Sequence, residues 1–137
     1  MKNGSDDLKI SRDKSLLQID SVMGLLGQSY WAQNRRIDVV QKSIENSICY
    51  GIYRNNLQIG FARVITDYAT TFYICDVIID QAYRGKGFGK KLINTIVSDE
   101  QLKSLMGILA TRDAHGLYGQ YGFKKDSEGF MRKLREE

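Results

Sequence analysis

The chain has 137 residues, of which 42% are hydrophobic and 26% are charged, as in an ordinary soluble globular domain. This composition excludes a disordered, collagen-like or fibrous protein, and we expect a single domain over residues 1–137. The formal net charge of +4 suits an anionic partner but is too weak to indicate a nucleic-acid-binding protein.

Targeting and metal-binding patterns are not evident in the sequence. The N-terminal residues 1–7 are polar with no apolar segment behind them, and no apolar run approaches the roughly 20 residues that span a bilayer. We therefore expect a cytoplasmic protein without membrane contact. Two cysteines and one histidine make a disulfide framework or a zinc site improbable, and we expect no metal. Cys49 and Cys75 should lie two strands apart, beyond disulfide reach.

The first half of the chain predicts a short strand, two helices and then a run of strands. Apolar residues recur at helical spacing over 18–28 and again at Ile37, Val40 and Ile44. The pair Asn55–Asn56 accepts the positive φ of a tight hairpin. The expected strands, rich in β-branched and aromatic residues, cover 8–12, 48–54, 57–66 and 70–79.

The second half predicts one crossover followed by a terminal hairpin. A glycine-rich loop leads into a helix over 88–98, a strand over 105–110 and a short helix over 115–121. A hairpin is expected over 123–134, turning near Ser127-Glu128-Gly129. The predicted fold class is therefore mixed α/β, with antiparallel strands first and then one strand–loop–helix–strand unit.

The segment Arg84-Gly85-Lys86-Gly87-Phe88-Gly89-Lys90-Lys91 carries the most chemical information. Its three alternating glycines allow backbone N–H groups to converge at the positive end of the next helix, where cations alone are unfavourable. An anion such as a pyrophosphate would be stabilised there; the alternative is a tight turn with solvated lysines. The spacing fits neither a Walker A loop nor the dinucleotide-binding fingerprint.

A second segment, Thr111 to Phe123, decides between these alternatives. Together the two segments resemble the GNAT superfamily of N-acetyltransferases. The family pattern R/Q-x-x-G-x-G/A is matched by Arg84, Gly87 and Gly89. The pattern N-x-x-A-x-x-L-Y-x-x-x-G-F is matched at five positions, namely Ala114, Leu117, Tyr118, Gly122 and Phe123.

The resemblance implies a mixed, mostly antiparallel twisted sheet with two N-terminal helices, a central acyl-CoA site and a C-terminal hairpin. It implies acetyl-CoA as the acyl donor and a primary amine as the acceptor. Thr111 stands where the family often has Asn, and its hydroxyl reaches less far than a carboxamide. The cofactor-binding positions carried over are Val77, Ile78, Ile79, Arg84, Gly85, Lys86, Gly87, Phe88, Gly89, Lys90, Thr111 and Ala114.

Three residues are candidates for the chemistry of acetyl transfer. Tyr118, which the resemblance places near the CoA sulfur, could protonate the leaving thiolate; alternatively it is an interior tyrosine. Asp76 interrupts an apolar run in phase with Phe72, Ile74 and Ile78. If it is desolvated, its raised pKa would suit a general base, and the alternative is an ion pair with Arg63. His115 could also be the base, or it could be a surface residue.

The acceptor pocket of the resembled family lies between the N-terminal helices and the open side of the sheet. Candidate lining residues are Tyr30, Trp31, Asp67 and Tyr68, with ordinary packing as the alternative. We expect a small amine or amino-acid-like acceptor. A homodimer could form through the C-terminal hairpin or an exposed strand edge.

Two other functions remain open at this point. One is a non-catalytic domain of the same fold that binds or senses acyl-CoA. The other, ranked lower, is a nucleic-acid-binding module with a steep salt dependence. Its basic residues would be Arg84, Lys86, Lys90, Lys91, Arg132, Lys133 and Arg135.

Overall fold

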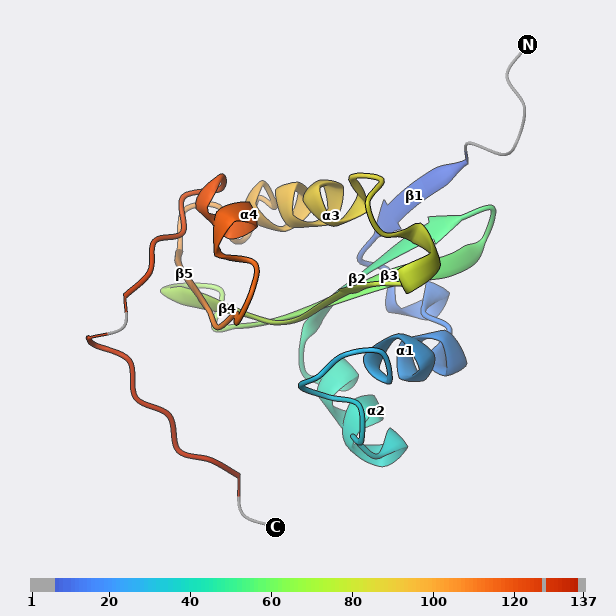
Figure 1. Cartoon of the computed structure of the whole chain (residues 1–137), viewed down its shortest axis with the longest axis horizontal. Coiled ribbons are helices and arrows are strands. Elements are labelled where there is room, and N and C mark those ends of the chain that lie inside the picture. Colours follow the sequence, from blue (N-terminus) through green and yellow to red (C-terminus); the bar gives the residue numbers. More distant parts are fainter. Residues whose placement is uncertain (1–6, 127, 136–137) are drawn as a thin grey trace.

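A five-stranded sheet with helices on both faces forms the body of the molecule (Figure 1). The structure is a computed structural model that describes residues 7–126 and 128–135. Helices α1 and α2 cover one face of the sheet, and α3 and α4 cover the other (Figure 1). The strands are β1 (Leu8–Ser11), β2 (Ile48–Arg54), β3 (Leu57–Thr66), β4 (Thr71–Ile79) and β5 (Met106–Leu109). The helices are η2 (Lys14–Leu16), α1 (Ile19–Leu26), α2 (Ile37–Glu45), η3 (Gln81–Tyr83), α3 (Phe88–Val97) and α4 (His115–Gly119).

The sheet follows chain order, β1-β2-β3-β4-β5. The first four strands pair antiparallel, and β5 returns parallel to β4 after the α3 crossover. Asn55 and Asn56 turn the β2–β3 hairpin with φ values of 51° and 71°, which asparagine tolerates better than most residues. The mixed fold class and the strands and helices predicted as far as residue 121 are confirmed.

Two apolar cores lie on opposite faces of the sheet. On one face, Leu92 and Ile96 of α3 pack against strand residues that include Tyr50 and Ile74. On the other face, Val22 and Leu26 of α1 pack, with Val40 of α2, against Cys49, Phe61 and Ile78. Burial on both faces holds the sheet rigid between the helices, so the strand ends that form the site have a fixed position.

A β-bulge at Cys75 changes the direction of side chains along β4. Arg63 pairs with Asp76 whereas Val64 pairs with Ile74, so Cys75 is the extra residue. Ile74 therefore belongs to the α3 face and Ile78 to the α1 face. The expectation that Asp76 is in phase with Phe72 and Ile74 is wrong, because the bulge breaks the two-residue period between them.

The bulge also coincides with the point where β4 and β5 separate. Their parallel pairing runs from Thr71↔Met106 to Ile74↔Leu109. A bulge bends its strand and increases the local twist. Beyond Ile74, no strand in the described part of the chain pairs with β4 on its β5 side. The second half of β4 therefore offers free backbone groups along one edge.

The C-terminal hairpin predicted over 123–134 is wrong for the described residues, in which the structure assigns no strand after β5. The expected turn includes Ser127, which lies outside the described residues. The segment runs away from the helices (Figure 1) and exposes the apolar side chains of Phe130, Met131 and Leu134. Without a partner strand or a core to cover them, alternating residues alone do not make a hairpin. The homodimer stays a prediction.

Cys49 and Cys75 are free, as expected, and lie on β2 and β4 with β3 between them. Residues 7–126 and 128–135 include no cluster of three or more side chains suited to holding a metal ion. Within the same ranges, every helix is too short or too polar to cross a membrane.

Candidate active site

A pocket of about 630 Å³ opens where β4 and β5 separate. Its walls come from segments far apart in the sequence: the α1–α2 loop, β3, β4, the loop between β5 and α4, α4 and the C-terminal segment. The lining residues are Tyr30, Trp31, Arg35, Arg63, Ile65, residues 73–77, residues 109–114, Tyr118 and Arg132.

Tyr118 reaches this pocket from α4 and is only 9% exposed. Its ring packs edge-on against Phe123 with centroids 6.0 Å apart. Its hydroxyl has no hydrogen-bond partner in the described part of the chain. Burial, together with the nearby Tyr30 and Asp113, raises the pKa of Tyr118 to about 12. The phenol is therefore protonated at physiological pH and is available as a donor.

Asp76 is the most buried charged residue of the pocket, at 1% exposure. Its carboxylate accepts hydrogen bonds from Arg63 Nε at 2.8 Å, Arg35 Nη1 at 3.1 Å and Trp31 Nε1 at 2.8 Å. Burial alone would raise the pKa of Asp76, but the hydrogen bonds and charges of these neighbours lower it below its ordinary value. The raised pKa expected from the sequence is therefore wrong, and the alternative, an ion pair with Arg63, is present.

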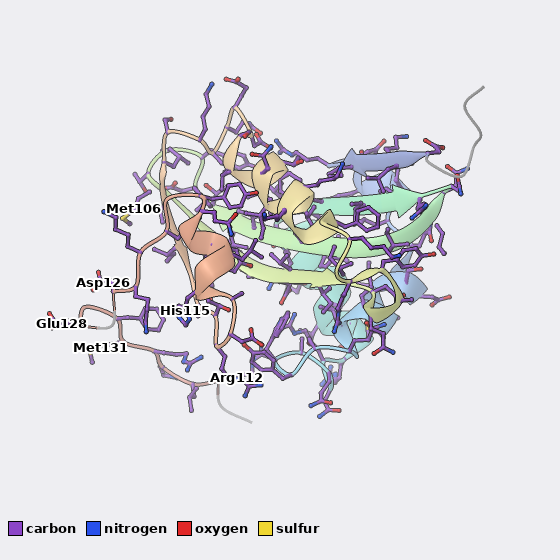
Figure 2. The ribbon with its side chains drawn as sticks, turned by 45° about the horizontal axis from the view of Figure 1, so that its top comes forward. Met106, Arg112, His115, Asp126, Glu128 and Met131 are labelled. Atoms are coloured by element: carbon purple, nitrogen blue, oxygen red, sulfur yellow. The ribbon has the colours of Figure 1, made fainter. Side chains whose placement is uncertain are left out.

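His115 lies at the start of α4 with its side chain exposed (Figure 2). It is not one of the residues that line the pocket. The structure thus brings Tyr118 into the pocket from α4 and leaves His115 outside it, although the two are three positions apart on the same short helix.

The α1–α2 loop supplies two of the four predicted acceptor-site residues. Ser29 fixes the loop, since its hydroxyl donates to Leu26 O at 2.7 Å and accepts from the amide of Ala32 at 3.0 Å. Tyr30 and Trp31 then project into the pocket and contact each other edge-on, with centroids 5.0 Å apart.

The other two predicted acceptor residues, Asp67 and Tyr68, do not line this pocket. Asp67 closes its own β3–β4 turn, accepting hydrogen bonds from the hydroxyl of Thr70 at 2.6 Å and from the amides of Ala69, Thr70 and Thr71. These bonds lower the pKa of its carboxyl. Tyr68 instead borders a smaller cavity of about 220 Å³ with Lys14 and Glu45. The turn chemistry of Asp67, an Asx turn, explains the residue without any ligand.

The glycine-rich loop lies between η3 and α3 and is exposed. Gly85 and Gly87 have φ values of 80° and 83°, and no atom lies within 4 Å of a Cβ built on either. Gly87 is the N-cap of α3, so the first amides of the helix point outward without intrahelical partners. Lys86 and Lys90 are exposed beside them.

Arg84 holds this loop against the sheet. Its Nε donates to Ile79 O at 2.8 Å, and its Nη2 donates to Gln28 Oε1 at 3.3 Å. Gln28 Oε1 also accepts from the amide of Gln81 at 3.0 Å. The Arg84 guanidinium, predicted as a cofactor ligand, therefore ties the end of β4 to the end of α1. No sequence motif could have identified Gln28 as the hydrogen-bond partner of Arg84.

The free edge of β4 includes Val77, Ile78 and Ile79, which pair with β3 and with no second strand of the described chain, and the Ile79 carbonyl also accepts from Arg84 Nε. Thr111 and Ala114 face the same opening from the loop after β5. Thr111 Oγ1 accepts from the amide of Ala114 at 3.1 Å and so shapes that loop. Phe88, the first residue of α3, packs against Tyr83 with ring centroids 6.4 Å apart.

Sequence reasoning did not predict that Arg35, Arg112 and Arg132 would line a pocket, and it considered Arg132 only for nucleic-acid binding. Arg112 places its guanidinium 3.7 Å from the centre of the Tyr30 ring, and its amide donates to Tyr30 Oη at 3.3 Å. This contact joins the loop after β5 to the α1–α2 loop, and Figure 2 shows Arg112 at this junction. Arg35 and Arg132 complete the set. No periodicity or motif connects these positions, because only the fold brings them together.

Comparison with known proteins identifies the family. Residues 45–125 match the model of the acetyltransferase (GNAT) domain. A solved structure from Xanthomonas campestris pv. campestris, a presumed acetyltransferase of the GNAT family, superposes with a TM-score of 0.88 at 37% identity and covers 93% of each chain. The match to the family model spans more than half of the chain, which therefore belongs to the GNAT acetyltransferase family.

Two curated relatives complete the comparison. A protein of Gibberella zeae, named as a presumed acetyltransferase, is 28% identical over 90% of this chain and 82% of its own length. A histone acetyltransferase of Glycine max is 34% identical over 52% of this chain. That match spans only 32% of the Glycine max protein, about a third of its length.

Proposed function

We propose that this protein transfers the acetyl group of acetyl-CoA directly to a primary amine. The observation that carries the proposal is the unpaired edge of β4 beyond Ile74, which lies between the glycine loop and a pocket containing Tyr118. A pantetheine arm has amide groups that can pair with such an edge like an extra strand. Val77 to Ile79 would supply the backbone partners.

The glycine loop would hold the diphosphate of acetyl-CoA. Residues Gly85 to Lys90 combine exposed amides, the positive end of the α3 dipole and the side chains of Lys86 and Lys90. Each of these features stabilises an anion, and together they offset the unfavourable placement of cations at a helix N-terminus. A ligand held at this loop and along β4 would direct its thioester toward the pocket.

The chemical step forms one bond and breaks one. The neutral amine attacks the thioester carbonyl, and the tetrahedral intermediate then expels the CoA thiolate as the new C–N bond is completed. The phenol of Tyr118 donates its proton to the departing sulfur and is reprotonated by solvent. Its raised pKa keeps the proton in place until a thiolate develops nearby.

We propose that water, rather than a side chain, takes the proton from the amine. Asp76 is held ionised by three donors, and His115 lies outside the pocket lining. Asp76 then acts as a positioning residue for Trp31 and Arg35. pH–rate profiles of Asp76→Asn and His115→Ala test this assignment. We expect the profile of each variant to retain the acidic limb of the wild-type profile. Loss of that limb in either variant would make the substituted residue the base.

A thiol-release assay with acetyl-CoA over a panel of primary amines tests the proposed function. Turnover on at least one amine, with the acetylated product identified by mass, is the expected result. Binding of acetyl-CoA without turnover on any amine would favour the alternative, a domain of the same fold that only binds or senses acyl-CoA.

A further inference from the structure

The active-site pocket contains more positive than negative side chains. Four arginines line it, Arg35, Arg63, Arg112 and Arg132, and the acidic residues among its walls are Asp76 and Asp113. One carboxylate, that of Asp76, is shared by Arg63 and Arg35. This buried group therefore carries an excess of one positive charge, and in a partly desolvated site such an excess attracts anions.

Arg112 and Arg132 add two positive charges to the pocket walls, where Asp113 is the one further carboxylate among the described residues. Neither has an ion-pair partner in residues 7–126 and 128–135, and both side chains are exposed. Arg112 rests its guanidinium on the face of Tyr30. A stacked guanidinium keeps its N–H donors in the plane available, and this planar fork matches a carboxylate or phosphate. The stacking also orients the fork before a ligand arrives, which reduces the entropy lost on binding.

These arginines are not accounted for by the diphosphate of acetyl-CoA. The proposed diphosphate site is the loop Gly85–Lys90, and none of its residues lines the pocket. The pocket arginines instead surround the space beside Tyr118 and Trp31, where the acceptor amine must lie to reach the thioester. The excess positive charge therefore influences which acceptor molecules bind in the pocket.

We propose that the acceptor is a small primary amine that carries a second, anionic group, a carboxylate or a phosphate, bound by Arg112 with Arg132. The inference rests on the proposed acetyl transfer and specifies its substrate class. The same field disfavours a lysine-rich peptide, the kind of acceptor that the name of the Glycine max histone acetyltransferase indicates for that relative.

The positive surroundings also assist the chemical step. An amine can attack the thioester only after it has lost its proton, and nearby cations disfavour the ammonium form. A simple ammonium ion would therefore enter the pocket poorly. An amine with an attached anion gains binding energy from the arginines while its nitrogen is still driven toward the neutral form.

Matched pairs of amines test the inference. The probes are tyramine and tyrosine, glucosamine and glucosamine 6-phosphate, and a lysine-rich peptide, each assayed for kcat/KM with saturating acetyl-CoA. We expect the member that carries the anionic group to exceed its partner without that group by about tenfold in at least one pair, the effect of one charge-assisted hydrogen-bond pair. The pair with the larger ratio identifies carboxylate or phosphate as the recognised group.

The variant Arg112→Gln connects the preference to this side chain. We expect it to lose about tenfold in kcat/KM for the amine with the anionic group, to change kcat/KM little for the amine without that group and to leave acetyl-CoA affinity unaltered. The matched control is Arg36→Gln, because Arg36 is exposed and pairs with Asp38 away from the pocket lining. It should keep the preference intact.

Two results would overturn the inference alone: equal or better kcat/KM for the amines without an anionic group or for the lysine-rich peptide, or an unchanged preference in Arg112→Gln. Acetyl-CoA binding without turnover on any amine would overturn the proposed function, and the inference with it.

Discussion

Tyr118 is a buried residue that lines the pocket, and its hydroxyl is the proposed proton donor. The variant Tyr118→Phe keeps the packing against Phe123 and removes only the proton donor. We expect kcat to fall by about tenfold or more while the affinity for acetyl-CoA is retained. Steady-state kinetics together with calorimetric titration of acetyl-CoA measure the two quantities separately.

Tyr53→Phe is the matched control for this prediction. The hydroxyl of Tyr53 is buried and has no hydrogen-bond partner among the described residues. Its removal should leave kcat unchanged and should not lower the free energy of unfolding, because no hydrogen bond is lost. A Tyr118→Phe enzyme with the turnover of Tyr53→Phe would remove Tyr118 from the chemistry.

Asp76 links the site to the stability of the fold. Its pKa is lowered in the folded state, so its ionised form contributes stability above the unfolded pKa of about 3.9, and this contribution is lost as the pH falls through the folded pKa. Asp76→Asn leaves Arg63 and Arg35 without their carboxylate. We expect a loss of about 3 kcal/mol in the free energy of unfolding at pH 7.

Denaturant unfolding of the wild type and Asp76→Asn at pH 7 and at pH 3 checks this prediction. The difference between the two proteins should shrink at pH 3, because the unfolded chain already binds a proton below its pKa of about 3.9 whereas the folded carboxyl, with its lowered pKa, resists protonation. An equal difference at both pH values would show that the ionised carboxylate is not the source of the stability.

At the level of single elements, the sequence predicts the strands and helices before residue 121 because their periodicity and turn residues agree with the fold. The bulge at Cys75 was not predictable, since the apolar run from Thr71 to Ile79 contains no glycine or proline and is interrupted only by Asp76. It moves Asp76 to the α1 face, where Arg35 and Trp31 contact it. Residues from three separate segments therefore determine the role of the Asp76 carboxylate. The sequence around Asp76 does not show which residues will contact it.

The conformation of the glycine loop before α3 predicts how a substitution there changes acetyl-CoA binding. Gly87 has a φ of 83°, which costs an alanine about 1 kcal/mol or more and displaces the amides that start the helix. Gly87→Ala should weaken acetyl-CoA binding by about tenfold, the equivalent of 1.4 kcal/mol. Calorimetric titration below the unfolding temperature of the variant measures the loss.

Gly24→Ala provides the comparison for the loop variant. Gly24 lies within α1 with no atom within 4 Å of an added Cβ, so alanine there should raise stability by about 0.5–1 kcal/mol and leave acetyl-CoA affinity unchanged. Equal affinities in Gly87→Ala and Gly24→Ala would mean that the loop conformation does not determine binding.

At the scale of the whole molecule, the pocket is assembled from segments that meet only after folding. Tyr30, Arg63, Arg112 and Arg132 come from four such segments. The motif residues, by contrast, lie within two short stretches, which is why the sequence alone could predict a cofactor loop and a role for Tyr118, and these roles stay predictions. The sequence could not indicate which arginines line the pocket, or that the Asp67 carboxylate accepts hydrogen bonds from its own turn.

The central claim is that amides of the glycine loop hold a diphosphate while the β4 edge holds the pantetheine arm of the same ligand. Calorimetric titration of the protein with acetyl-CoA and with S-acetylpantetheine, which lacks the diphosphate, tests it most directly. We predict that acetyl-CoA binds at least about tenfold more tightly, since charge-assisted hydrogen bonds to the diphosphate are lost in the shorter ligand. Equal affinities, or no heat with millimolar acetyl-CoA on correctly folded protein, would contradict the account.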